Sequence, residues 1–384
     1  MSVPTRILYV VNDTGFFLSH RLPLAQAAHA NGYEVHVATP EDEASKTIPS
    51  YGYKHHVVSI GRKSMNPLGE LKTFLCLFQL YKKIHPDIVH QVTIKPVIYG
   101  GFAARLAGVP AMVSAFTGLG HIFVDHGLKA KIMRLLTKIT LRLSLNHRNC
   151  VVIFQNPDDR ELFIREGLIN ASNARLIKGS GVDMAGFSPS EEPQGIPLAV
   201  LASRMLWNKG VGIFVEAATI LRDRVHARFA LVGYTDPGNP EAIPDTQLAV
   251  WKDEGVVEFW GRCSDMIDVF RQAFVICLPS YYGEGVPKVL IEAAACGRPI
   301  VTTDTPGCRE IVRHGINGLL VPPRDSSALA GALQQLLVDP ELRRRMGRAG
   351  REIVVAEFSL EKVVSETLTI YRQLLACAAT VIVD

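Results

Sequence analysis

The 384-residue sequence lacks several features that mark secreted, disulfide-bonded or metal-binding proteins. Its seven cysteines include no Cys-x-x-Cys pair, and their odd number gives no disulfide framework, which favours a reducing compartment. Its twelve histidines show no metal-ligand spacing. The first apolar run, residues 7–11, is too short for a secretion signal. We therefore expect a cytoplasmic protein with no metal and no bound cofactor.

Long uncharged runs are also scarce. Only residues 106–124 extend over nineteen positions without Asp, Glu, Lys or Arg, which is enough for a membrane span by length. The run contains a proline, three glycines and a histidine, so we interpret it as a buried parallel strand that leads into a glycine-rich loop. The sequence has no low-complexity tract, no short repeat and no nucleic-acid-binding motif, so we expect no nucleic-acid partner.

Apolar runs of strand type alternate with helical patterns along the whole chain, which is typical of parallel sheets covered on both faces. The expected strands are 6–11, 34–40, 55–60, 87–92, 111–116, 150–155, 198–203, 228–232, 256–260, 274–279, 299–303 and 318–321. We predict an α/β protein of two doubly wound, Rossmann-like domains that face each other across a cleft. The expected domains are residues 1–187 and 188–365, with a tail, 366–384, that packs back on the first domain.

Charge is distributed unevenly between the two predicted domains. Residues 1–186 carry 21 Lys and Arg against 13 Asp and Glu, whereas the remainder carries 20 against 24. Within the basic half, Lys131, Arg134, Lys138 and Arg142 share one face of a predicted helix over 128–146, beside an apolar stripe. This pattern indicates either an ordinary core-facing helix or a surface that binds an anionic membrane, and both readings can hold together.

The most informative segment lies between Glu284 and Glu292, two carboxylates eight positions apart around a glycine-containing loop. Pro287 and Gly297 suit the start and the end of a short helix. Free backbone N–H groups at such a helix start bind phosphate. Glu292 would lie about 7–8 Å along the helix, which suits ribose hydroxyls, while Glu284 would face a sugar. The alternative is a pair of solvated surface charges. The spacing predicts a nucleotide-sugar site, with further donor contacts from Gly285, Val286, Pro287, Lys288 and Val289.

Other motifs accompany this segment over nearly the whole chain. They are Gly-Arg-Pro-Ile-Val-Thr-Thr-Asp-Thr-Pro-Gly-Cys-Arg-Glu-Ile-Val at 297–312, Asn-Gly-Leu-Leu-Val-Pro-Pro at 317–323, Arg-x4-Lys-Gly at 204–210, Gly-Val-Asp at 181–183 and a loop at Gly15. Together they resemble the retaining family 4 glycosyltransferases of the GT-B fold.

The resemblance implies roles for individual residues. Arg204 and Lys209 would contact the donor diphosphate and neutralise it as it departs, in place of a metal ion. With Glu284, which would orient the sugar, they form the predicted catalytic set. Gly15 would approach the donor phosphates or the acceptor, and Arg262 would lie where the family holds the nucleobase. Each of these residues can instead be an ordinary turn or strand-end residue.

The acceptor is expected on the first domain, with candidate contacts from His20, His90, Lys95, Thr117 and His121. The alternative for His90 is a packed strand histidine, which is the more common role of a histidine at such a position. The sequence departs here from many family members, which carry a histidine in the loop after the strand at 111–116. Phe116 and Thr117 cannot replace an imidazole, and His121 comes a few positions late. The loop is instead similar to that of transferases acting on polyprenyl-diphosphate-linked sugars, including bacterial N-acetylgalactosaminyltransferases of protein-glycosylation clusters.

The sequence is therefore expected to encode a retaining, metal-independent hexosyltransferase. The donor would be a nucleotide sugar used as co-substrate, such as UDP-GalNAc, UDP-Gal or UDP-GlcNAc. The acceptor would be an undecaprenyl-diphosphate-linked saccharide in bacterial surface polysaccharide, capsule, O-antigen or glycoprotein glycan assembly, at the inner face of the cytoplasmic membrane. The alternatives are a lipopolysaccharide core glycosyltransferase, a GT-B nucleotide-sugar 2-epimerase and a non-catalytic nucleotide-sugar sensor.

Overall fold

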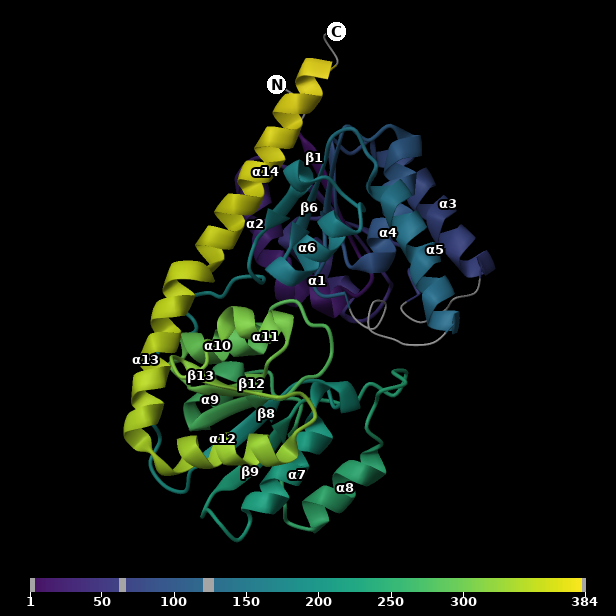
Figure 1. The fold of residues 1–384 in the computed structure, drawn as a ribbon. Coiled ribbons are helices and arrows are strands. Elements are labelled where there is room, and N and C mark those ends of the chain that lie inside the picture. The colour runs from purple at the N-terminus through teal and green to yellow at the C-terminus, as the bar shows by residue number, and fades with distance from the viewer. Residues whose placement is uncertain (1–3, 62–66, 120–127, 382–384) are drawn as a thin grey trace. The chain divides into compact units, whose positions relative to one another are not determined.

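A computed structural model describes residues 4–61, 67–119 and 128–381. The chain forms two compact units, Met1–Ser180 together with Glu361–Asp384, and Gly181–Leu360 (Figure 1). The first division falls earlier than the predicted boundary after residue 187. The reason is that Val182 pairs with the end of its own unit: its N–H donates to the Phe358 carbonyl at 3.1 Å, and its carbonyl accepts from Leu360 at 3.0 Å.

The first unit contains a parallel sheet of order β3-β2-β1-β4-β5-β6-β7. Its strands are β1 Arg6–Val11, β2 Glu34–Thr39, β3 Lys54–Val57, β4 Ile88–Val92, β5 Ala111–Ala115, β6 Cys150–Phe154 and β7 Ala174–Leu176. Its helices are α1 Thr14–His20, α2 Leu22–Ala30, α3 Pro67–Ile84, α4 Ile94–Ala107, α5 Leu128–Leu145, α6 Pro157–Arg165 and most of α14 Leu360–Val381. The short helical turns η1 Ala44–Tyr51 and η3 Ala171–Asn173 complete it.

Alternation along the strands of this sheet creates two separate cores. Ile7, Tyr9 and Val11 of β1 point to one face, where α1, α2 and α14 pack. Leu8 and Val10 point to the other, which α3, α4, α5 and α6 cover. The carboxyl-terminal helix α14 joins the first core through buried residues, Val363, Leu368, Ile370, Tyr371 and Leu374.

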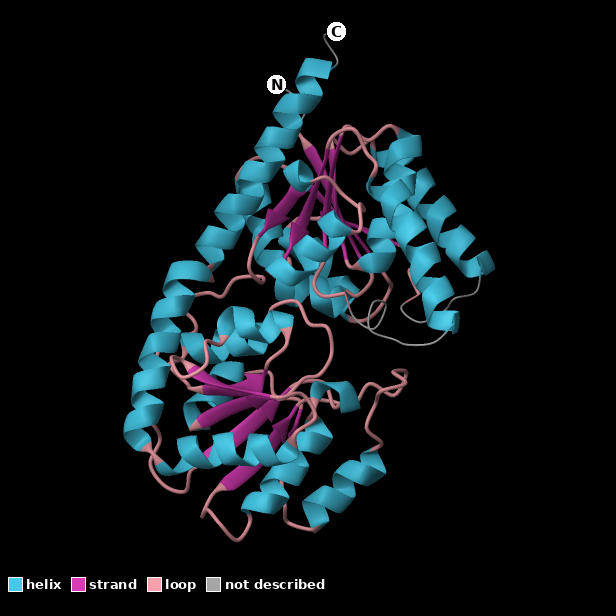
Figure 2. Cartoon of the chain, in the orientation of Figure 1, coloured by secondary structure: helices cyan, strands magenta, loops and turns pink. Residues whose placement is uncertain are grey.

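The second unit contains a parallel sheet, whose strands are magenta in Figure 2. Its strand order is β10-β9-β8-β11-β12-β13. Its strands are β8 Leu198–Ala202, β9 Arg228–Val232, β10 Glu258–Gly261, β11 Val275–Leu278, β12 Ile300–Thr303 and β13 Gly318–Val321. Its helices are α7 Val211–Leu221, α8 Asp245–Asp253, α9 Met266–Gln272, α10 Lys288–Ala295, α11 Pro306–Ile311, α12 Ser326–Val338 and α13 Pro340–Glu357, with a short turn, η4 Trp207–Lys209. The central strands β8, β11 and β12 are buried along their whole length, as continuous apolar runs predict.

Both sheets are doubly wound, which confirms the predicted fold class. In each, strand order reverses beside the first strand of the unit, between β1 and β4 and between β8 and β11. Ligands of open α/β sheets bind in the crevice outside the carboxyl ends of the strands at such a switch point. Among the strands that the structure describes, the three-residue β7 was not predicted, because Ala-Arg-Leu is too short to show a period.

The uncharged run at 106–124 forms the end of α4 and the buried strand β5, as far as the structure describes it. Within the described parts of the chain, no helix combines the length and the apolar character that crossing a bilayer requires.

Candidate functional site

The predicted donor residues gather at the switch point of the second sheet. Arg204 and Lys209 lie just beyond the carboxyl end of β8, and Glu284 lies in the loop beyond the carboxyl end of the neighbouring strand β11. Because adjacent parallel strands end at the same sheet edge, residues 75 positions apart in the chain come into contact.

Lys209 and Glu284 form an ion pair in which Nζ of the lysine donates to Oε1 of the glutamate. The side chains are 16% and 12% exposed, so the pair is largely withdrawn from water. The Oγ of Ser280 donates to the same carboxylate oxygen at 2.9 Å. Glu284 is thus fixed by two partners, and Lys209 still has two N–H donors that a phosphate can use.

Arg204 is held by a different acid. Its Nη1 donates to Oδ2 of Asp236 at 3.0 Å, and its side chain is 36% exposed. Tyr282 lies nearby, and its phenol has a raised pKa because of burial and the Glu284 charge, which Arg204 partly offsets. The two cations of the predicted catalytic set therefore lie at one site, and each is held by its own carboxylate, Arg204 by Asp236 and Lys209 by Glu284.

Helix α10 begins at Lys288, so Pro287 stands one residue before the helix rather than in its first position. Its N-terminal turn contains Val289, and the loop that leads into it contains Gly285 and Val286. Gly297 adopts φ 72° just past the helix end, as predicted.

Glu292 is 8% exposed on α10 and forms an ion pair with Lys288 at 3.1 Å. Burial raises the pKa of this carboxyl, and the Lys288 charge opposes the rise. A buried carboxylate with one cation partner retains acceptor capacity for a pair of hydroxyls.

Two glycines set the shape of this edge. A Cβ on Gly307, in the first turn of α11, would lie 1.4 Å from the carbonyl oxygen of Gly285, so α11 approaches the Glu284 loop at backbone distance. A Cβ on Gly210, which has φ 76°, would lie 2.1 Å from the Pro279 carbonyl oxygen. Only glycine allows these approaches.

Arg262 follows β10 at the same sheet edge, and its guanidinium lies 5.3 Å from the ring centre of Tyr234. Both side chains are exposed. A planar cation over an aromatic ring provides a surface on which a nucleobase can stack.

In the first unit, Gly15 lies differently from the sequence prediction. It is the second residue of helix α1 and not part of an open loop, because Asp13 caps the helix by accepting a hydrogen bond from the Phe16 N–H. Gly15 is exposed, with a negative φ, so this position does not use the conformational freedom of glycine. His20 ends the same helix, stacked on Phe16 at 4.0 Å between ring centres and 2.7 Å from the Ser19 Oγ.

His90 is a core residue. It is 1% exposed in β4, and its Nδ1 lies 2.5 Å from the hydroxyl of Tyr371 on α14. Burial, with a smaller contribution from the Arg21 charge, lowers the pKa of this imidazole well below its usual value, so the ring is neutral. A side chain enclosed in this way does not face an acceptor, and we leave His90 out of the acceptor site.

Lys95 lies in the first turn of α4, at the switch point of the first sheet, and forms an ion pair with Glu70 of α3 at 2.7 Å. Thr117 follows β5 and is half-buried. His121 lies outside the described residues. The structure therefore places Lys95 and Thr117, but not His90, beyond the carboxyl ends of the strands.

Two family profiles match this chain. The family described as "Glycosyl transferase 4-like" matches residues 6–156, and the family described as "Glycosyl transferases group 1" matches residues 196–339. The two matched segments fall in the first and the second unit. The chain belongs to these glycosyltransferases.

Named relatives match most of the length of this glycosyltransferase. The N,N'-diacetylbacillosaminyl-diphospho-undecaprenol alpha-1,3-N-acetylgalactosaminyltransferase of Campylobacter jejuni is 30% identical over 86% of this chain and 91% of its own length. An Escherichia coli UDP-Gal:alpha-D-GlcNAc-diphosphoundecaprenol alpha-1,3-galactosyltransferase is 25% identical over 80% and 81%. The solved sucrose-phosphate synthase of Thermosynechococcus elongatus superposes with a TM-score of 0.79 at 22% identity, covering 97% of this chain and 100% of that one. The fold is GT-B.

Three residues of this glycosyltransferase site were not predicted from the sequence. Asp236 and Ser280 are single polar residues in loops after strands, and nothing in their local sequence indicates their partners. Gly307 stands in Thr-Pro-Gly-Cys, where the glycine after a proline signals a turn but not a backbone approach. In the described parts of the chain, no group of three or more His, Cys, Asp or Glu side chains is arranged to hold a metal ion.

Proposed function

We propose that this glycosyltransferase binds a UDP-sugar at the carboxyl edge of the second sheet and transfers the sugar, with retention of configuration, to a polyprenyl-diphosphate-linked saccharide. The observation that carries the proposal is the convergence of Lys209, Arg204 and Glu284 at one switch point. Two cations and an oriented carboxylate suit a ligand with a diphosphate beside a sugar.

In the proposed reaction, the bond between the anomeric carbon and the phosphate oxygen breaks, and the acceptor oxygen bonds to the same face of that carbon. The acceptor hydroxyl proton passes to the departing diphosphate, so no protein nucleophile is needed. Lys209, Arg204 and the N-terminus of α10 stabilise the charge that develops on the leaving group. These groups would supply the positive charge without a metal ion or another cofactor.

Glu284 and Glu292 take opposite ends of the donor in this proposal. Glu284, held by Ser280 and Lys209, orients the sugar hydroxyls. Glu292 accepts hydrogen bonds from the ribose, and Arg262 with Tyr234 stacks against the base.

The names of the two relatives support the substrate classes. The C. jejuni relative is named for transfer to an undecaprenol-diphosphate-linked sugar, and the E. coli relative is named for a UDP-Gal donor and a diphosphoundecaprenol-linked acceptor. We infer a UDP-hexose or UDP-N-acetylhexosamine donor and a role in assembling a lipid-linked surface polysaccharide or glycoprotein glycan.

A membrane-binding face on the first unit fits a lipid-linked acceptor. Helices α3, α4 and α5 pack side by side (Figure 1) and leave large apolar side chains in solvent. These side chains are Leu68, Leu71, Leu75, Leu106, Met133, Leu135, Leu136, Ile139 and Leu143. The predicted stripe on α5 is thus exposed at Leu136, Ile139 and Leu143, whereas Leu141 and Leu145 fill the core.

Basic residues border this apolar face. Lys72 and Arg142 are exposed on α3 and α5, and Arg105 is exposed at the end of α4. Apolar groups flanked by Lys and Arg insert between anionic headgroups. We propose that this face holds the enzyme at the inner surface of the cytoplasmic membrane.

The test is a nucleotide-release assay over UDP-, GDP- and dTDP-sugars, with and without a polyprenyl-diphosphate-linked sugar. We expect UDP release that depends on the acceptor, and proton NMR of the product should show the anomeric configuration of the donor. An inverted product would contradict retention. Free epimerised sugar without acceptor would identify an epimerase, and UDP binding without release would identify a sensor.

A further inference from the structure

A cavity of about 630 Å³ lies in the second unit, at the edge of the sheet opposite the proposed donor site. Its floor is formed by residues that precede strands, Phe274 before β11 and Arg298 with Pro299 before β12, whereas Glu284 follows β11. In a parallel sheet all strands begin at one edge and end at the other. The cavity lies where the strands begin and the proposed donor site lies where they end. The cavity therefore does not belong to the donor site.

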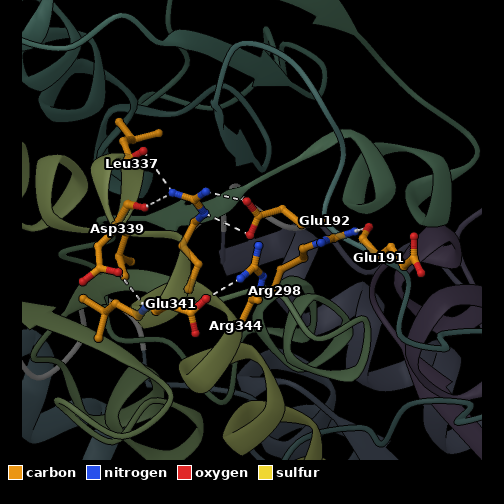
Figure 3. Close-up of polar contacts among 10 residues, drawn as sticks. Glu191, Glu192, Arg298, Leu337, Asp339, Glu341 and Arg344 are labelled. Carbon is orange, nitrogen blue, oxygen red and sulfur yellow. Dashed lines mark hydrogen bonds and ion pairs between the residues drawn. The ribbon is translucent and has the colours of Figure 1, made fainter.

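Arginines from two elements line this cavity. Arg298 comes from the turn before β12, and four more come from α13. Figure 3 labels two of these arginines, Arg298 and Arg344. On α13 the spacing of Arg344, Arg348 and Arg351, four and then three residues, places them along one helix face. Arg343 is the fourth arginine that α13 contributes to the lining, and it is buried.

The buried arginines are fixed in place by many contacts. Arg298 is 3% exposed, and it donates from Nε to the Phe270 carbonyl at 2.8 Å and from Nη2 to the Ser190 Oγ at 2.6 Å. Arg343 donates to the carbonyls of Leu336 and Leu337 at 2.6 and 2.9 Å. This fixed layer forms the wall of the cavity, and no entropy is lost in ordering it when a ligand binds.

The arginines at the mouth of the cavity, Arg344 and Arg348, are exposed and make fewer contacts than the buried ones. Arg344 pairs with Glu341 on its own helix and is 55% exposed. Arg348 is exposed, and in the described part of the chain it makes no hydrogen bond or ion pair. Its guanidinium retains all five donors for a ligand.

Acidic residues also line the cavity, and their charge must be weighed. Glu192 is neutralised by Arg343, whose Nε and Nη2 both donate to its carboxylate. Glu191 and Glu352 are exposed at the surface. Five arginines against three glutamates leave the lining positive.

We propose that this arginine-lined cavity binds a small organic phosphate at a second site, separate from the donor site. Planar guanidinium groups match phosphate oxygens in pairs, which a lysine cannot do. The volume lies within the range of small-molecule pockets, and Phe274, Pro189 and Pro299 provide an apolar wall for the organic part. The phosphate would sit between Arg348 and Arg344 at the mouth.

The experiment is calorimetric titration of glucose 1-phosphate and of inorganic phosphate into the full chain, with glucose as the uncharged comparison. Four proteins are compared: the wild type, R348A, the double variant R344A/R348A, and R345A. Arg345 is exposed on the same helix but does not line the cavity, so R345A removes the same charge outside the site. K209A serves as the variant of the proposed donor site.

We expect saturable binding of glucose 1-phosphate with a dissociation constant on the order of 1 mM or below. Loss of one charge-assisted contact should weaken it about tenfold in R348A and further in the double variant, with R345A and K209A unchanged. No saturable binding to the wild type, or equal weakening in R345A, would overturn the site. Binding lost only in K209A would assign the phosphate to the donor site, and this outcome would overturn the second site while supporting the proposed function.

Discussion

The carboxyl edges of the two sheets differ in how their charged groups are partnered. At the second edge, each carboxylate of the proposed donor site is paired with a cation, Glu284 with Lys209 and Glu292 with Lys288. At the first edge, the half-buried carboxyl of Asp159, in the helix that follows β6, has an amide as its partner: the Asn156 Nδ2 donates to it at 2.9 Å. The first edge also holds an ion pair, Lys95 with Glu70, so the difference lies in Asp159, a carboxyl whose partner is neutral.

Backbone strain shows the same difference. At the first switch point Thr93 adopts φ 74° and donates from Oγ1 to Asn12 at 2.9 Å, so the strain is held by a neutral hydrogen bond between loops. At the second switch point the unusual backbone positions are glycines, which relieve strain and bring loops together. The second switch point therefore relies on close backbone packing, and the first on a side-chain hydrogen bond.

The largest expected effect comes from breaking a charge pair of the second edge. Lys209→Ala removes a cation that would face the departing diphosphate, so kcat/KM should fall by about 10²–10³. Glu284→Ala should fall on the same scale, because the sugar loses its orienting carboxylate. Acceptor-dependent UDP release measures both.

Lys252→Ala, at an exposed position of α8, is the matched control and should keep wild-type turnover. Near-normal turnover in both site variants would remove the assigned roles. A fall in turnover that came with a lower unfolding temperature would point to damage of the fold instead.

The close packing of the second edge is tested by Gly307→Ala. The added Cβ would lie 1.4 Å from the Gly285 carbonyl oxygen, so α11 or the Glu284 loop must shift. We expect a loss of about 1–3 kcal/mol in the free energy of unfolding, together with reduced turnover. Urea unfolding and the release assay measure the two effects.

Gly331→Ala in α12 is the control, since nothing lies within 4 Å of its Cβ. That change should stabilise the protein by about 0.5–1 kcal/mol, because alanine favours helix over glycine. Equal stabilities for the two variants would show that the approach of α11 is not a constraint.

Some residues of the proposed donor site could be predicted from the sequence, and others could not. The donor residues were predictable because Glu-x7-Glu and Arg-x4-Lys-Gly place their chemistry within short segments beside recognisable strands. Their partners Asp236 and Ser280 were not, because long-range hydrogen bonds leave no local pattern. Gly15 was misplaced because Asp13 also serves as a helix cap, and a capped turn and an open loop read alike.

In the first unit, the sequence did not predict which side chains are buried and which are exposed. His90 in Ile-Val-His-Gln-Val has the polar character of a ligand-binding residue, but β4 is buried on both faces and α14, 281 positions away, supplies Tyr371 as its partner. The stripe on α5 shows the reverse case: periodicity predicted an apolar face and left open whether it faces the core or the solvent. Tertiary packing decides both, and no local period encodes it.

A third prediction concerns the exposed apolar face of α5. Replacing Leu135, Leu136 and Ile139 together with serine removes apolar area that would enter the bilayer, so binding to vesicles containing anionic lipid should weaken at least about tenfold. Vesicle sedimentation measures this, and turnover on a short-chain, soluble acceptor should be unchanged. The matched control replaces Val250, Val338 and Val355, exposed in the second unit, with serine. Equal vesicle binding by both triple variants would contradict a membrane face on α5.

The smallest expected effect tests Asp159 at the first edge, whose carboxyl has an amide rather than a cation as its partner. Burial raises the pKa of Asp159 to about 6, with a further rise from Asp158 and a partial offset from Asn156. The folded state therefore holds this proton more tightly than the unfolded chain, whose carboxyl titrates near 3.9. The resulting stability is complete below that lower pKa and is lost as pH rises through about 6.

Asp159→Asn should then be more stable than the wild type by about 1 kcal/mol at pH 7.5, with no gain at pH 4. Urea unfolding at the two pH values measures the difference. Asp158→Asn, at an exposed neighbouring position, should show a smaller gain at pH 7.5, because it removes only the lesser contribution to the raised pKa of Asp159. A gain of equal size at both pH values would mean that the charge of Asp159 is not what costs stability, and the difference between the two edges would lose its electrostatic basis.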